Sequence, residues 1–212
     1  MKRIDCYLDV VSPYAYLAFE QLPRALEGLG YEVVYRPILF AGLLKAHGQL
    51  GPAEIAPKRD WTYQHVLWQA QALGIPMHRP AAHPFNPLAL LRLAWACARQ
   101  GTPSRYVCET LLRHVWRADG AAADDPARLA QLTAQLAPAL DPASNEVKQA
   151  LKDATEGALA AGVFGVPTFA VDGRLFWGLD ALPMLRAQLE GDARLDTLWH
   201  DAARVAPGTA RR

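Results

Sequence analysis

The chain has 212 residues, of which 51% are hydrophobic and 20% are charged, and its formal net charge is +1 at pH 7. A chain of this length can bury a substantial core, and the composition is that of an ordinary globular protein. Acidic and basic residues are interspersed, so the bulk charge favours neither a nucleic-acid partner nor a membrane surface. The sequence has no apolar run of about 18 residues, so we expect no transmembrane helix.

The cysteines and histidines argue against a disulfide framework and a metal site. Cys6, Cys97 and Cys108 are widely spaced and form no C-x-x-C pair, so we expect reduced thiols in a cytoplasmic protein. Asp5 and Asp9 interrupt the first apolar run too early for a secretory signal, which agrees with that location. The six histidines form no H-E-x-x-H motif, and we expect no bound metal.

The first 40 residues predict a βαβ unit. Residues 4–11 favour a strand, and residues 32–39 favour a second one. Between them, Ser12 followed by Pro13 predicts a helix start, because serine is a strong N-cap and proline suits the first helical position. This order of elements favours a parallel pair of strands with a right-handed crossover.

The middle of the chain, residues 41–162, is rich in Ala, Leu, Gln and Arg at helical spacing. We expect helices over residues 58–73, 86–100, 103–118, 126–137 and 143–161. Strand-forming residues return at 168–171 and 174–177, around an Asp-Gly pair that predicts a hairpin, and a helix is expected over 181–190.

This order predicts an α/β protein with a thioredoxin-like fold, in which one four-stranded mixed sheet (βαβ…ββα) carries a large all-helical insertion. Residues 1–40 and 163–192 would form the thioredoxin-like domain, and residues 41–162 the inserted helical domain. Residues 193–212 are an Ala/Arg-rich tail, for which we expect partial disorder.

Two predicted junctions carry candidate ligand contacts. At the first, the helix N-terminus at Ser12 offers unpaired N–H groups and partial positive charge, which favour an anion such as a thiolate. The Ser12 hydroxyl could donate to that thiolate; the alternative is that it only caps the helix. At the second, a cis Pro167 would turn the Val166 N–H and C=O outward to receive an extended peptide, whereas a trans proline would simply begin a strand. Asp180 either caps the last helix or meets a ligand ammonium group.

Three motifs together make these junctions more specific: D-x-x-S-P-Y-x-Y-L at 9–17, G-V-F-G-V-P-T-F at 162–169 and F-W-G-L-D at 176–180. In this order and spacing, the sequence resembles the 2-hydroxychromene-2-carboxylate isomerases. They belong to the DsbA-like, kappa-class glutathione transferase branch of the thioredoxin superfamily. The resemblance covers residues 3–190.

The resemblance implies a homodimeric, glutathione-dependent isomerase of aromatic catabolism, in which a thiolate adds transiently to a double bond of a small aromatic carboxylate. It implies that Ser12 stands beside the glutathione sulfur, where a redox relative would carry cysteine, and that Val166, before cis Pro167, pairs with the glutathione backbone. It places a last group of residues at the γ-glutamyl end: Trp177, Gly178, Leu179 and Asp180.

The substrate side departs from the family pattern. The family often shows an Asn-Arg pair after a Gly-Pro and a tyrosine near a later proline, and neither is present at the matching positions here. Lys58 is similar to a family lysine that faces carboxylates. Lys45, His83 and Asn86 are candidate substitutes for the missing contacts.

Other functions remain open at this point. A kappa-like transferase or peroxidase would use the same site with another electrophile, and a thioredoxin-like scaffold without catalysis would serve as an interaction module. A disulfide oxidoreductase is disfavoured, because residues 12–15 contain no dithiol.

Overall fold

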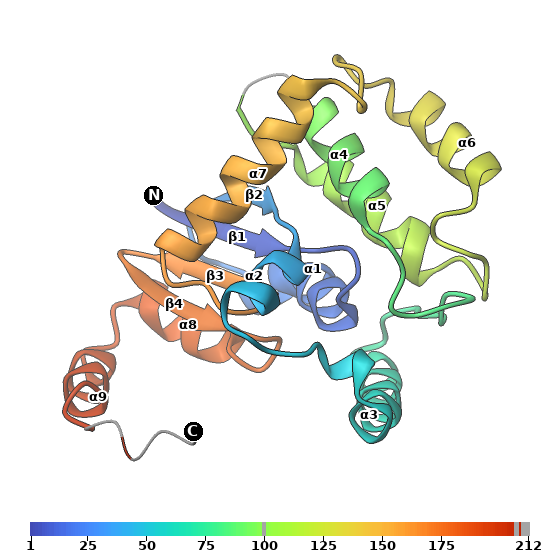
Figure 1. Ribbon diagram of the computed structural model, residues 1–212. Helices are drawn as coiled ribbons and strands as arrows, with labels where there is room; N and C mark the ends of the chain where they lie inside the picture. The colour runs from blue at the N-terminus through green and yellow to red at the C-terminus, as the bar shows by residue number, and fades with distance from the viewer. Residues whose placement is uncertain (99–100, 206–207, 209–212) are drawn as a thin grey trace.

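The computed structural model of the chain describes residues 1–98, 101–205 and 208. One four-stranded sheet has the strand order β2-β1-β3-β4 (Figure 1). The parallel pair is β1 (Lys2–Leu8) and β2 (Tyr31–Pro37), and β3 (Thr168–Val171) runs antiparallel to β1. β3 also pairs antiparallel with β4 (Arg174–Trp177). The predicted α/β thioredoxin-like fold, with its mixed sheet, is therefore confirmed.

The helical segment between β2 and β3 contains the five helices predicted there and two short ones that the sequence did not predict. Residues 99–100, the end of the predicted helix 86–100, lie outside the described residues. The helices of this segment are α2 (Phe40–Ala46), the 3-10 helix η1 (Pro52–Glu54), α3 (Ala56–Leu73), α4 (Leu88–Ala96), α5 (Arg105–Trp116), α6 (Pro126–Leu136) and α7 (Asn145–Ala160). In the part of the chain that the structure describes, no helix is both long and apolar enough to cross a bilayer.

The side chains of β1 alternate between two hydrophobic layers. Ile4, Cys6 and Leu8 belong to the larger layer, which also contains buried residues of α1 (Pro13–Ala25), α8 (Leu182–Glu190) and helices of the inserted segment. Tyr7 belongs to the smaller layer, with Leu43 and with residues at and beyond the end of α7, namely Ala158, Val163 and Val166. The smaller layer thus anchors the loop that leads to Pro167.

Part of the tail, residues 193–212, forms a helix that the sequence did not predict. Residues Arg194–Ala202 form helix α9, and Leu195 is buried. The Trp199 ring packs against Phe176 of β4 at 5.5 Å, and the Arg174 guanidinium lies 5.0 Å from the centre of that ring. Residues 206–207 and 209–212 lie outside the described part of the chain.

Candidate active site

Ser12 occupies the junction between β1 and α1 and makes two hydrogen bonds there. Its hydroxyl oxygen accepts the Ala15 N–H at 3.2 Å, which caps α1, and its hydroxyl group donates to the Val166 carbonyl at 3.3 Å. The first turn of α1 contains no acidic residue, so no side chain of that turn offsets the partial positive charge of this helix end. Both sequence interpretations of Ser12 are therefore compatible with its geometry: it caps the helix and it faces the proline loop.

Asp9 fixes the loop that carries Ser12. The side chain is fully buried, and its two carboxylate oxygens accept the Val11 N–H at 3.0 Å and the Phe40 N–H at 2.9 Å. Burial raises the pKa of Asp9 to about 7, although the two backbone hydrogen bonds act in the opposite direction. The sequence analysis did not assign a role to Asp9; an acidic residue at the end of an apolar strand was the available signal.

The Val166–Pro167 peptide bond is cis, as the Gly-Val-Pro-Thr pattern predicts. The loop is held from both sides, because the Thr168 hydroxyl donates to the Gly165 carbonyl at 2.8 Å and the Gly178 N–H donates to the Pro167 carbonyl at 2.9 Å. Among the hydrogen bonds of the described residues, none involves the Val166 N–H. The Val166 backbone can therefore offer a donor to an extended ligand.

The turn after β4 places an exposed carboxylate near this loop. Gly178 has φ +100°, and a Cβ atom at that position would lie 2.4 Å from Asp180 Oδ1. The N-cap of α8 is Ala181, which has no side chain able to cap, so the structure does not use Asp180 as the helix cap. Leu179 is partly buried between Gly178 and the exposed Asp180. The Asp180 carboxylate is thus available to a cationic group.

Trp177 forms one wall beside the proline loop. Its half-exposed ring meets Phe164 edge to face, with ring centres 5.0 Å apart. A Cβ atom on Gly165 would lie 2.5 Å from Trp177 Nε1, so only glycine fits at that position beside this ring.

Tyr14 links the start of α1 to α3, a contact that the sequence analysis missed. The Tyr14 hydroxyl lies 2.7 Å from His65 Nδ1, and the His65 ring stacks against Trp61 at 5.8 Å and Trp68 at 6.4 Å. Burial and then the charge of Asp180 raise the pKa of Tyr14, so Tyr14 lies within electrostatic range of Asp180 as well. The spacing of Trp61, His65 and Trp68 along one helix face was the signal in the sequence.

His83 supports the same loop from a second side. Its Nε2 atom lies 2.8 Å from the Val11 carbonyl, which fixes the tautomer with the proton on Nε2, and its Nδ1 atom is buried without a hydrogen-bond partner. Burial lowers the pKa of His83 and so favours the neutral ring. Of the predicted substrate contacts, His83 is the one that the structure joins to the Ser12 loop.

The other three candidate substrate contacts lie elsewhere. Lys58 is exposed in the first turn of α3, and Lys45 is exposed in the last turn of α2. The Asn86 side chain accepts the Leu88 N–H at 3.1 Å at the start of α4. Among the described residues, no hydrogen bond or ion pair joins these three side chains to Ser12.

Burial limits the reactivity of two of the three thiols. Cys6 and Cys108 are buried, and burial raises the pKa of Cys6 to about 12 and raises that of Cys108 as well. Cys97 is partly buried. In residues 1–98, 101–205 and 208, no group of three or more His, Cys, Asp or Glu side chains is placed to hold a metal ion.

Comparison with known proteins assigns the chain to a family. The model of the DsbA-like thioredoxin domain matches residues 3–190. The chain belongs to the DsbA-like thioredoxin family. Within the DsbA-like proteins, it is 28% identical over 193 residues to the 2-hydroxychromene-2-carboxylate isomerase of Pseudomonas putida, covering 88% of this chain and 93% of that one.

Two further DsbA-like relatives agree with this assignment. The chain is 27% identical over 199 residues to glutathione S-transferase kappa 1 of Rattus norvegicus, covering 86% of this chain and 88% of the relative. A solved structure of a 2-hydroxychromene-2-carboxylate isomerase superposes with a TM-score of 0.74 at 26% identity, covering 94% and 98% of the two chains. The relatives described here are thus named as isomerases and as a glutathione transferase.

Proposed function

We propose that this chain is a glutathione-dependent isomerase that converts 2-hydroxychromene-2-carboxylate to trans-o-hydroxybenzylidenepyruvate. The observation that carries the proposal is the Ser12 hydroxyl, which stands at the N-terminus of α1 and faces the Val166 carbonyl beside cis Pro167. Similarity to isomerases and kappa-class transferases over most of the chain supports the same class of activity.

The residues of the site fit glutathione at three places. A thiolate at the start of α1 would meet the Ser12 hydroxyl and the partial positive charge of the helix. The Val166 N–H is the donor for the peptide backbone, and the exposed carboxylate of Asp180 suits the ammonium group of the γ-glutamyl end. Trp177 and Leu179, which lie on either side of Gly178 in the chain, would flank the ligand between these two contacts.

When bound, glutathione would supply a thiolate that adds reversibly to the conjugated double bond left by opening of the chromene ring, so that the resulting single bond can rotate before expulsion of the thiolate restores the double bond. The task of Ser12 is to stabilise the negative charge on sulfur by turning its hydroxyl from the Val166 carbonyl toward the thiolate. A hydroxyl suits this task better than a thiol, because it cannot form a mixed disulfide. Asp9 and His83 hold the backbone on either side of Val11 and so keep Ser12 in place.

The decisive experiment combines glutathione titration by calorimetry with an isomerisation assay, with and without glutathione. We expect glutathione binding and chromene turnover that depends on glutathione. Ser12→Ala should lower turnover, whereas Ser104→Ala, which removes an equivalent cap from α5, should not. Turnover that proceeds equally without glutathione would contradict the proposal.

Two other results would identify the competing functions. Conjugation of 1-chloro-2,4-dinitrobenzene without chromene turnover would indicate a kappa-like transferase. Failure to bind glutathione at all would indicate an interaction module without catalysis.

A further inference from the structure

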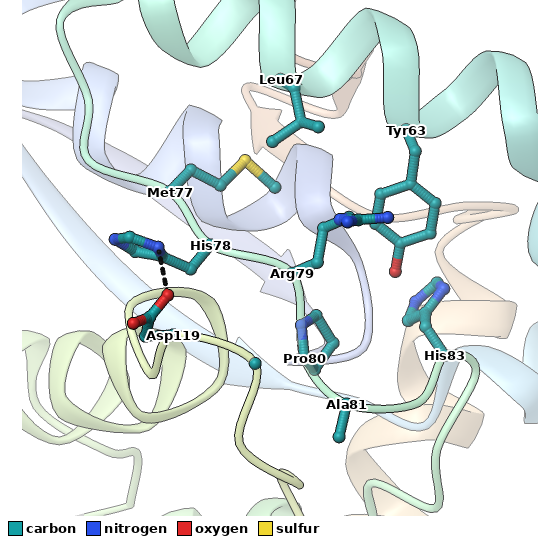
Figure 2. Close-up of a pocket in the computed structure, with 10 residues that line it drawn as sticks. Tyr63, Leu67, Met77, His78, Arg79, Pro80, Ala81, His83 and Asp119 are labelled. Carbon is teal, nitrogen blue, oxygen red and sulfur yellow. Dashed lines mark ion pairs between the residues drawn. The ribbon is translucent and has the colours of Figure 1, made fainter.

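An open cavity shares the His83 side chain with the loop that carries Ser12. It has a volume of about 570 Å³ and lies between α3, the segment around Arg79 and the turn at Asp119 (Figure 2). His83 forms part of its wall and also binds the Val11 carbonyl, which belongs to the residue preceding Ser12. His83 is therefore shared by the wall of the cavity and the support of the Ser12 loop, and the volume of the cavity is in the range of pockets for small molecules.

One end of this cavity is positively charged. Burial raises the pKa of Tyr63 to about 12, and the nearby charges of Arg79 and Arg59 partly oppose that shift, so both guanidinium groups act on the Tyr63 hydroxyl. No ion pair of the described residues involves Arg79. Asp119, at the other side of the cavity, is highly exposed and lies 3.2 Å from His78 Nδ1. Arg59 lies 3.8 Å from Asp60 Oδ1, so Arg79 is the cation at the Tyr63 end that no acidic side chain of the described residues neutralises.

Apolar side chains also line this cavity. Figure 2 shows Leu67 of α3 and Met77 pointing toward one another, while the Arg79 guanidinium lies beside the Tyr63 ring and the Tyr63 hydroxyl points toward His83. The apolar side chains, together with the Arg79 cation and the Tyr63 hydroxyl donor, fit a flat ring that carries one negative group. Methionine also packs favourably against aromatic rings.

We propose that this cavity binds the aromatic carboxylate on which the enzyme acts, with the Arg79 guanidinium pairing with the carboxylate and the Tyr63 hydroxyl donating to it. The inference rests on the proposed function for the identity of the substrate, but the charge and shape of the cavity are independent of it. Arg79 presents a planar pair of N–H donors, which suits a carboxylate better than a single ammonium group does. It thereby takes the place of the Asn-Arg contact that this sequence lacks.

The test compares the binding of coumarin-3-carboxylate with that of uncharged coumarin by calorimetry, in the presence of glutathione. A hydrogen bond to a charged group corresponds to about ten- to a hundredfold in affinity, so the wild type should prefer the carboxylate by that factor. Arg79→Gln should remove the preference and leave coumarin binding unchanged. Arg24→Gln, at an exposed position in the last turn of α1, is the matched control and should keep the preference.

A second variant tests the hydroxyl without altering charge. Tyr63→Phe should reduce the preference for the carboxylate by a smaller factor, of about three- to tenfold, and leave the affinity for glutathione unchanged. Circular dichroism of each variant confirms that the fold is kept.

Three results would overturn the assignment: a wild type with no preference for the carboxylate, an Arg79→Gln variant that keeps it, or an Arg79→Gln variant that loses glutathione affinity instead. The outcome is separate from that of the proposed reaction. Loss of the preference in a protein without chromene turnover would support the cavity and reject the reaction. Chromene turnover, together with an Arg79→Gln variant that keeps the preference for the carboxylate, would support the reaction and reject the cavity.

Discussion

Helices α1 and α5 begin in the same way but in different surroundings. Ser12 accepts the Ala15 N–H at 3.2 Å, and Ser104 accepts the Val107 N–H at 3.3 Å, so each caps its helix through the third residue beyond it. Ser104 is exposed, whereas Ser12 is buried and also donates to the Val166 carbonyl, 154 residues away. The cap itself does not distinguish a structural serine from a functional one. The difference lies in the group to which the hydroxyl donates.

The largest expected effect separates these two serines. Ser12→Ala removes a donor to the thiolate, so the pKa of bound glutathione should rise by about one to two units and turnover near neutral pH should fall about ten- to a hundredfold. Ser104→Ala should cost about 0.5–2 kcal/mol of stability and leave turnover unchanged. Titration of the ultraviolet thiolate absorbance in each variant measures the pKa. Identical titrations for wild type and Ser12→Ala would show that Ser12 acts only as a helix cap.

The buried carboxyl group of Asp9, which fixes the loop that carries Ser12, makes the stability of the protein depend on pH. The pKa of Asp9 is raised from an ordinary value of 3.8 to about 7, so between these values the folded protein binds the proton more tightly than the unfolded chain does. This contribution to stability is complete below about pH 4 and is lost as the pH rises through 7. Between pH 5 and pH 7, the free energy of unfolding of the wild type should fall by about 2 kcal/mol relative to that of Asp9→Asn.

The Asp9→Asn variant is needed as the reference because His83 and His114 act in the opposite direction. Burial lowers the pKa of both histidines, so their contribution to stability is lost as the pH falls below about 6.5. Denaturant unfolding of both proteins at each pH cancels the histidine contribution. If the free energy of unfolding changed with pH in the same way in both proteins, Asp9 would be ionised throughout this pH range.

A smaller effect is expected at the far end of the site. Gly178 and Gly173 both have positive φ, at +100° and +77°, so an alanine at either should cost about 1–2 kcal/mol of stability. Only at Gly178 would the new Cβ collide with the Asp180 carboxylate, because nothing lies within 4 Å of that atom at Gly173. Glutathione affinity should therefore fall about tenfold in Gly178→Ala and stay unchanged in Gly173→Ala. Equal glutathione affinities of Gly178→Ala and Gly173→Ala would show that Asp180 does not contribute to glutathione binding.

The smallest effect is expected for the buried thiols. Because burial raises the pKa of Cys6 and Cys108, neither forms a thiolate at neutral pH, and neither should take part in turnover. Cys6→Ala and Cys108→Ala should keep full glutathione-dependent activity per folded molecule, and both thiols should resist alkylation until the chain is unfolded. Activity lost from either variant with the fold intact would argue against a serine-based site.

The sequence predicted the elements that carry strong local signals. The Asp-Gly hairpin, the Ser-Pro start of α1 and the long periodic helices of the insertion are all present. The short elements α2, η1 and α9 were missed, because short helices depend on tertiary contacts rather than on propensity. The Phe40 N–H at the start of α2 binds the carboxylate of Asp9, 31 residues away, and α9 is held by the contact of Trp199 with Phe176.

The same distinction applies to the candidate site. Ser12 and cis Pro167 sit in motifs that can be read locally, and the structure brings them within one hydrogen bond of each other. Tyr14 and His65 are 51 residues apart, and neither belongs to a motif that predicts contact with the other. Arg79 lies in a stretch with no secondary structure, so no periodicity indicated which way its side chain points.

The contact between Gly165 and the Trp177 ring also constrains how this protein can change over generations. A Cβ atom at position 165 and an indole at position 177 cannot coexist without displacing the ring, since they would be 2.5 Å apart. A lineage that gains a larger residue at 165 must therefore first, or at the same time, accept a smaller one at 177. The two positions should vary together among homologues, even though eleven residues of sequence stand between them.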